Sequence, residues 1–175
     1  MAPAVRLAAT SDFEAVAAIV NHYIATTAIN FRTEPQTAGE WRAEWEPQRA
    51  RFPWLVAEAG GEVIGVAYAA PWKTRAAYDW SAEVTVYVRH GHARRGVGGA
   101  LYRELLGRLD AQGYRTQIAV IALPNEPSVA AHEALGFRPA GRLEAVGYKH
   151  GAWHDVGFWQ RRTGATDAPR AIGSV

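Results

Sequence analysis

The sequence predicts a single α/β (α+β) domain in which helices flank a mixed central sheet of about six to seven strands. Three observations predict it: a length of 175 residues suits one domain with a sizeable core, strand-like and helix-like segments interleave, and no repeat or linker divides the chain. We assign the domain to residues 1–163. Residues 164–175 are small and polar and are expected as a loose C-terminal tail.

Seven segments are expected as strands, because apolar residues alternate with polar ones or fill the segment. They are residues 4–10, 54–59, 62–70, 81–88, 117–123, 137–145 and 154–160. Gly60-Gly61 is a two-residue hairpin signal that makes the first half of the sheet mostly antiparallel. The run 117–123 is continuously apolar, which suits a strand covered on both faces. Residues 71–80 break the pattern and are expected as a loop.

Four helices are expected from their caps and apolar stripes. Capping boxes at Ser11–Glu14 and Thr37–Glu40 begin the first two helices, and Pro47 interrupts the second. The third helix follows a glycine-rich turn and closes at Gly113. Ser128 is expected to cap the fourth.

The segment 81–101 joins a strand, a basic glycine-rich turn and a helix. Glu83 lies on the polar face of the strand, and the turn spans His92–Gly99. This geometry aims backbone N–H groups and a positive helix end at a phosphate, although the turn lacks the Lys-Ser or Lys-Thr of a P-loop. Alternatively, the glycines only permit a tight turn and Arg94-Arg95 is solvated.

Composition excludes several classes of function. A formal net charge of +2 with scattered basic residues argues against a nucleic-acid partner. The absence of cysteine excludes disulfides, thiolate metal sites and a cysteine acyl-enzyme. The histidines show no metal-ligand spacing, so no metal is expected. No run is long and apolar enough for a membrane helix and no signal peptide is evident, so a cytoplasmic protein is expected.

Two motifs resemble those of the GNAT acetyltransferases: Arg94-Arg95-Gly96-Val97-Gly98 after a strand, and the block Asn125–Phe137. Further blocks over residues 21–160 are similar to the phosphinothricin N-acetyltransferase subfamily. They are NHYI, NFRTEP, RFPWLVAE, PWKTRAAYDW, VTVYV, AVIALPNEPSVAAHEALGF and GYKHGAWHDVGFWQ. The resemblance implies a GNAT fold and a homodimer. It also implies transfer of acetyl from acetyl-CoA to the α-amino group of phosphinothricin by direct attack in a ternary complex.

In this resemblance the turn holds the pyrophosphate of acetyl-CoA, the central strand pairs with the pantetheine arm, and an asparagine contacts CoA. The implied cofactor-binding residues are Val86, Tyr87, Val88, Arg94, Arg95, Gly96, Val97, Gly98, Gly99 and Asn125. One departure is Ala93, which stands where the family usually has Gln or Arg. The backbone donors of the turn remain, so CoA binding is still expected.

Glu83 is the expected base that removes a proton from the attacking ammonium, directly or through water. Alternatively, it is a solvated or arginine-paired carboxylate. His132 stands where many relatives carry a tyrosine near the CoA sulfur, and it could protonate the thiolate or help to hold the substrate. Alternatively, it caps a local carbonyl.

Cationic and hydroxyl side chains in the 71–80 loop suit the carboxylate and phosphinate of the acceptor. The expected substrate-binding residues are Phe31, Tyr68, Lys73, Thr74, Arg75, Tyr78 and Thr85. Ordinary packing is the alternative for the aromatic ones. The tryptophans of residues 41–54 are expected to be exposed and able to form the dimer contact. Methionine sulfoximine or sulfone is an alternative acceptor, and an idle CoA-binding regulatory module is the alternative function.

Overall fold

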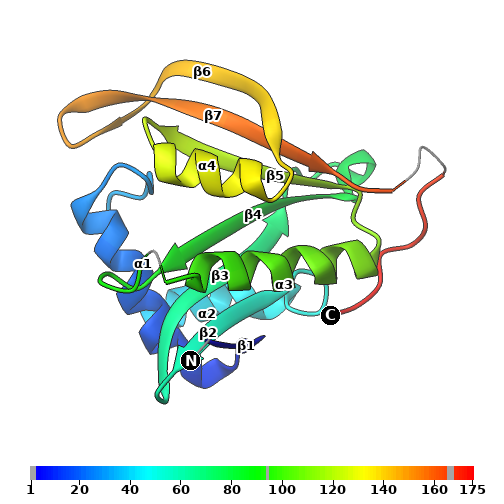
Figure 1. Cartoon of the computed structure of the whole chain (residues 1–175), viewed down its shortest axis with the longest axis horizontal. Coiled ribbons are helices and arrows are strands. Elements are labelled where there is room, and N and C mark those ends of the chain that lie inside the picture. The colour runs from blue at the N-terminus through cyan, green and yellow to red at the C-terminus, as the bar shows by residue number, and fades with distance from the viewer. Residues whose placement is uncertain (1–2, 94, 165–167) are drawn as a thin grey trace.

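A computed structural model describes residues 3–93, 95–164 and 168–175, and its centre is a seven-stranded mixed sheet (Figure 1). The strands are β1 (Ala4–Leu7), β2 (Trp54–Ala59), β3 (Glu62–Pro71), β4 (Ser81–Val88), β5 (Thr116–Leu123), β6 (Arg138–Lys149) and β7 (Ala152–Arg162). They lie in the order β1-β2-β3-β4-β5-β7-β6. Only β4 and β5 pair in parallel; every other described pair is antiparallel. The predicted fold class is confirmed.

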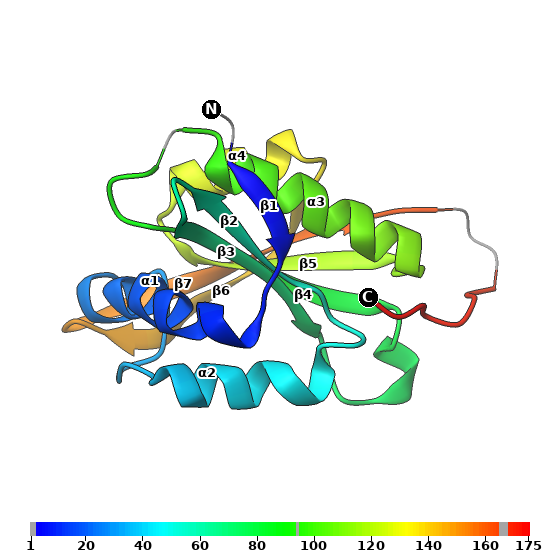
Figure 2. The ribbon, with the colours of Figure 1, turned by 90° about the horizontal axis from the view of Figure 1, so that it is seen from below.

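Helices cover both faces of the sheet (Figure 2). α1 (Phe13–Thr26) and α2 (Ala38–Trp45) pack on one face, and α3 (Val97–Gln112) and α4 (Glu126–Ala134) on the other. The alternation of β4 divides its side chains between these layers, because Ala82 and Val84 join the core beneath α3. Glu83 lies between these two residues, so its side chain projects from the opposite face of the sheet.

The tryptophans of residues 41–54 are buried, so the expectation that they are exposed for a dimer contact was wrong. Trp41, Trp45 and Trp54 belong to the core between α1, α2 and the sheet. The Phe13 ring lies 5.0 Å from that of Trp45 and 5.9 Å from that of Trp54. Burial of such large apolar rings stabilises the packing of the otherwise polar α2 on the sheet.

Of the three expected N-terminal helix caps, two were wrong and one is confirmed; the expected end of α3 at Gly113 is also confirmed. The Asp12 carboxylate, instead of a Ser11–Glu14 box, accepts the Ala9 N–H at 2.7 Å just before α1. The Thr37–Glu40 box is present, with reciprocal hydrogen bonds at 2.7 and 3.2 Å. At α4 the Asn125 side chain is the cap and accepts the Ser128 N–H at 3.3 Å, because Ser128 already lies in the first helical turn.

The last strands also differ from expectation. β5 buries Ala119 and Ile121 on one face only, whereas Val120 on the other is 39% exposed, so coverage of both faces was wrong. The hairpin β6–β7 is longer than predicted and turns at His150-Gly151, where both residues have positive φ. The sequence pattern missed these extensions because β6 is an edge strand whose residues are almost all exposed.

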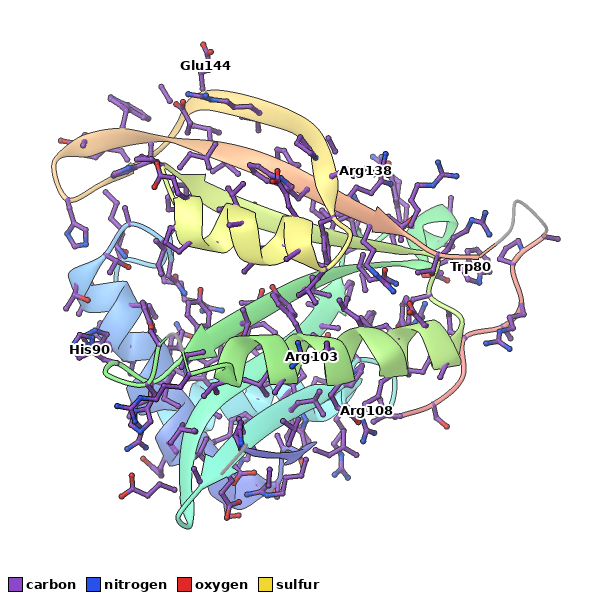
Figure 3. All side chains as sticks on the ribbon, viewed as in Figure 1. Trp80, His90, Arg103, Arg108, Arg138 and Glu144 are labelled. Carbon is purple, nitrogen blue, oxygen red and sulfur yellow. The ribbon has the colours of Figure 1, made fainter. Side chains whose placement is uncertain are left out.

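The C-terminal residues lie against the end of α3. Trp80, labelled in Figure 3, donates its indole N–H to the Arg170 carbonyl at 2.6 Å. The N–H groups of Gly173 and Val175 donate to Gln112 and Ala50 at 2.9 Å each. The segment expected as a loose tail is thus hydrogen-bonded to the body over these residues. The division of the chain at residue 163 stays a prediction.

Candidate active site

The pairing of β4 with β5 stops after three residues, at Glu83 and Ile118, although both strands continue. Beyond that point the two strands diverge toward the N-terminal end of α3 (Figure 1). The Arg89 N–H donates to Ile64 on β3, and hydrogen-bonding residues alternate along an antiparallel strand. The backbone N–H of Val86 therefore faces the gap and not β3. A strand edge of this kind can pair with an extended ligand.

A narrow slot of about 70 Å³ lies in this gap. It brings together five residues that the sequence analysis assigned to the site: Thr85, Val86, Tyr87, Asn125 and His132. The backbone of Tyr87 faces β3, so its contribution to the slot is its side chain and not a strand-like pair with the ligand. Burial raises the pKa of the Tyr87 phenol to about 12, and this group stays protonated.

His132 is buried and held at both ring nitrogens. Nδ1 lies 2.7 Å from the Ser128 carbonyl and Nε2 lies 2.8 Å from the Tyr102 hydroxyl. A carbonyl can only accept, so Nδ1 carries the proton and Nε2 accepts from Tyr102. Burial lowers the pKa of His132, which favours this neutral form. His132 therefore caps a local carbonyl, that of Ser128, and also forms part of the wall of the slot.

Tyr102 was not among the expected site residues, but it lines the same slot and is 2% exposed. Burial raises the pKa of its phenol, so the hydroxyl remains a donor. One signal was available in the sequence: Tyr102 lies beside Leu101 on the apolar face of α3, which indicates burial. A buried hydroxyl needs a hydrogen-bond partner, so a polar contact could have been expected there. That partner is on α4, and a single sequence does not reveal the pairing.

Glu83 lies at the closed end of the gap, opposite Ala70 of β3. It is half-buried, and among the described residues none of the ion pairs involves it. Burial raises the pKa of its carboxyl, and the charge of Lys73 opposes that rise. A desolvated carboxylate of raised pKa is a stronger base than a solvated one, which suits proton abstraction.

The glycine-rich turn leads into the N-terminus of α3. Gly96 precedes the helix with φ of 79°, a conformation that favours glycine. The first-turn N–H groups of Val97, Gly98 and Gly99 have no partner within the helix, and the helix dipole adds positive potential there. Arg95 is exposed beside them, and Arg94 lies outside the described residues. Figure 3 labels His90 before this turn and Arg103 on the helix after it.

The expected substrate residues fall into two groups. Thr85 and Tyr68 are cross-strand partners, and the Tyr68 ring stacks on Trp54 at 4.2 Å, so packing also explains this tyrosine. The side chains in the 71–80 loop are exposed: Lys73, Thr74, Arg75 and Tyr78. Lys73 Nζ lies 4.6 Å from the centre of the Trp72 ring. Phe31 is 38% exposed and lies 6.2 Å from the His154 ring.

Comparison with known proteins agrees with this geometry. The family model of the acetyltransferase (GNAT) domain matches residues 5–157, which is most of the chain. The chain belongs to the GNAT acetyltransferase family. It is 56% identical over 171 residues to the phosphinothricin N-acetyltransferase of Streptomyces viridochromogenes, covering 98% of this chain and 93% of that protein.

Two further relatives bear on the acceptor and the cofactor. The chain is 34% identical to the L-methionine sulfoximine/L-methionine sulfone acetyltransferase of Pseudomonas paraeruginosa over 91% of this chain and 94% of that one. The crystal structure of a phosphinothricin acetyltransferase from Sinorhizobium meliloti in complex with AcCoA superposes with a TM-score of 0.93. That protein is 33% identical to this chain, and the match covers 97% of this chain and 94% of the Sinorhizobium meliloti protein.

Within the described ranges, no three His, Cys, Asp or Glu side chains converge as metal ligands would. No helix among these residues is both long and apolar enough to cross a membrane.

The two hydrogen bonds of His132 predict its protonation state. At pH 6.5, where a free histidine is half protonated, His132 should be mainly neutral with its proton on Nδ1, because burial lowers its pKa. Nitrogen-15 NMR of the imidazole rings measures both properties, with a histidine peptide as reference. A half-protonated His132 at this pH, or a proton on Nε2, would contradict the assignment.

Proposed function

We propose that this protein transfers the acetyl group of acetyl-CoA to the α-amino group of phosphinothricin by direct attack in a ternary complex. The observation that carries the proposal is the early end of β4–β5 pairing, with Glu83 at the closed end of the gap and the N-terminus of α3 at the open end. The 56% identity to the Streptomyces viridochromogenes enzyme supports the acceptor.

The residues present fit acetyl-CoA. The N–H groups of Val97, Gly98 and Gly99 suit a diphosphate, and Arg95 adds charge. The Val86 carbonyl and the Val88 N–H face the gap by the same alternation and suit the amides of the pantetheine arm, and Asn125 lines the same slot. When bound, acetyl-CoA supplies an activated acyl group as a thioester.

The chain's own groups then handle protons and charge. Glu83 takes a proton from the amino group of the acceptor, and its raised pKa makes this transfer more favourable. The Val86 N–H can donate to the carbonyl oxygen as negative charge develops on it. The buried Tyr102–His132 pair lies in the slot wall, and the Tyr102 hydroxyl would have to turn its one hydrogen bond from His132 Nε2 to the departing sulfur in order to stabilise the thiolate.

The acceptor carries a carboxylate and a phosphinate, so cations are its natural partners. Lys73 is near enough for its charge to act on Glu83, and Arg75 lies two residues further along the same loop. Methionine sulfone and sulfoximine present a tetrahedral sulfur with a similar outline. The Pseudomonas paraeruginosa relative favours these as second acceptors of the same site.

We also propose a homodimer in which the hairpin β6–β7 meets a second copy. The support is an apolar patch on this edge: Tyr148 and Trp153 are 60% and 65% exposed, with their rings 5.3 Å apart. The expected cytoplasmic location remains part of the proposal, because acetyl-CoA is available there.

Light scattering tests the proposed homodimer. The measured mass should be twice the chain mass of 19.1 kDa, and Trp153→Glu should lower the measured mass toward that of one chain. A wild type of single-chain mass would refute the dimer.

A thiol-release assay with acetyl-CoA tests the acceptor. Phosphinothricin should give the highest kcat/KM, methionine sulfoximine and methionine sulfone should follow, and glutamate without a tetrahedral group should be poor. Intersecting double-reciprocal plots are expected for a ternary complex. Stabilisation by acetyl-CoA without release of thiol from any amine would instead favour the idle regulatory module.

Glu83→Gln should lower kcat by about 10²- to 10⁴-fold and leave the affinity for acetyl-CoA nearly unchanged, because the amide keeps the shape but cannot accept the proton. In the wild type, kcat/KM should rise with pH through a value above the ordinary glutamate pKa, since burial raises the pKa of Glu83.

Glu144→Gln is the matched control for this substitution. Glu144 is exposed on β6 and points away from the body in Figure 3, so its loss should leave kcat unchanged. Full activity of Glu83→Gln at neutral pH would show that another group is the base.

A further inference from the structure

Lys149, at the end of β6, is one of only two lysines in the chain and is 6% exposed. Its Nζ donates to the carbonyl oxygens of Ile24 and Asn30, each at 2.6 Å. Within the described residues both of its hydrogen-bond partners are neutral, and none of the ion pairs includes it. Burial of an ammonium group without a carboxylate is costly, so this arrangement calls for an explanation.

The end of α1 supplies part of the missing negative charge. Ile24 lies in the last turn of α1, where carbonyl groups lack helical partners and the helix dipole is negative. Lys149 therefore caps α1 from a strand more than a hundred residues away. Water could satisfy the same carbonyl, so capping alone does not account for a buried lysine. Its second bond, to Asn30, shows what else it holds.

Asn30 is a buried link between Lys149 and the slot. Its carbonyl accepts from Lys149, and its side-chain Nδ2 donates to the Tyr87 hydroxyl at 2.9 Å. Its neighbour Ile29 lines the slot directly. The segment from Thr27 to Phe31 is thus tied both to the tip of the hairpin and to the phenol of a slot residue.

The hairpin tip holds this segment at two further points. His150 Nε2 lies 3.2 Å from the Thr27 carbonyl. The Phe31 ring packs against the Cα of Gly147, so closely that a methyl group there would overlap it. Figures 1 and 2 both show the tip of β6–β7 beside the C-terminal end of α1. These contacts, with Lys149 buried at their centre, join an edge hairpin to the wall of the slot.

We propose that Lys149 is a positioning residue for the acceptor: by holding the segment 27–31 it fixes Ile29, which lines the slot, and the neighbouring Phe31, which is expected to contact the acceptor. This inference rests on the proposed acetyl transfer. Lys149 does not touch the reacting atoms and acts through Asn30. The N-terminus of α3, which would hold the diphosphate of acetyl-CoA, makes no contact with Lys149 among the described residues, so the main anchor of the cofactor should be unaffected and the effect should fall on the acceptor.

Lys149→Met keeps the chain length and removes the donor. We expect about a tenfold rise in KM for the acceptor, an unchanged KM for acetyl-CoA and faster amide exchange over residues 27–32. Arg138→Met, an exposed change at the other end of β6 (Figure 3), should alter none of these. A rise in both KM values with faster exchange throughout the chain would mean a merely structural role and would overturn the proposal.

Rescue separates the ammonium group from simple packing. The chain has no cysteine, so Lys149→Cys provides a single thiol that aminoethylation in denaturant converts into a lysine analogue. After refolding, the aminoethylated protein should regain a low acceptor KM, whereas a propylated one should not. Wild type taken through the same treatment is the reference. Equal acceptor KM values for the two products would overturn the proposal.

Gly147→Ala is a second variant that leaves Lys149 intact. The added methyl group must displace the Phe31 ring, so the acceptor KM should rise while the KM for acetyl-CoA stays constant. An unchanged acceptor KM would overturn the proposal, because the position of Phe31 would then not matter. If wild type acetylates none of the acceptors, the proposed function fails. In that case, amide exchange over residues 27–32 in Lys149→Met still tests whether Lys149 holds this segment in place.

Discussion

The site depends on one constraint: β4 and β5 stop pairing after Glu83 while each stays anchored to its other neighbour. A sheet normally satisfies every backbone group in its interior, so a gap between central strands leaves groups that need another partner. Leu101 and Leu105 belong to the core that packs α3 on the sheet beside this gap. An extended ligand can then complete the sheet, and the proposed base, Glu83, lies at the closed end of the same gap.

Buried polar groups around the gap are paired across elements far apart in the chain. Tyr102 on α3 meets His132 on α4, and Lys149 on β6 meets the end of α1. Each such pair costs desolvation, which for a buried ammonium amounts to about several kcal/mol. A core made for stability alone would place apolar residues there. These buried polar pairs fix the orientation of side chains at and near the slot.

The sequence predicted the strand, the glycine turn and the helix that form this site, because these features depend on local periodicity and on backbone conformations that favour glycine. Glu83 could be placed on the polar face of β4 for the same reason. The burial of Trp41 and Trp54 was not predictable from local pattern, since it depends on how α2 folds back on the sheet. Likewise, the partners of Tyr102 and Lys149 come from distant elements, and one sequence without an alignment does not show which residues meet. The acceptor class came only from resemblance to a family.

The most direct test of the central claim is to follow each backbone amide by NMR as acetyl-CoA is added to the protein. We expect the amides of Val86 and of Val97–Gly99 to shift together and become protected from exchange, whereas Tyr87, whose amide faces β3, should gain little protection. Saturable binding that leaves Val86 unprotected and perturbs amides elsewhere on the sheet would contradict it.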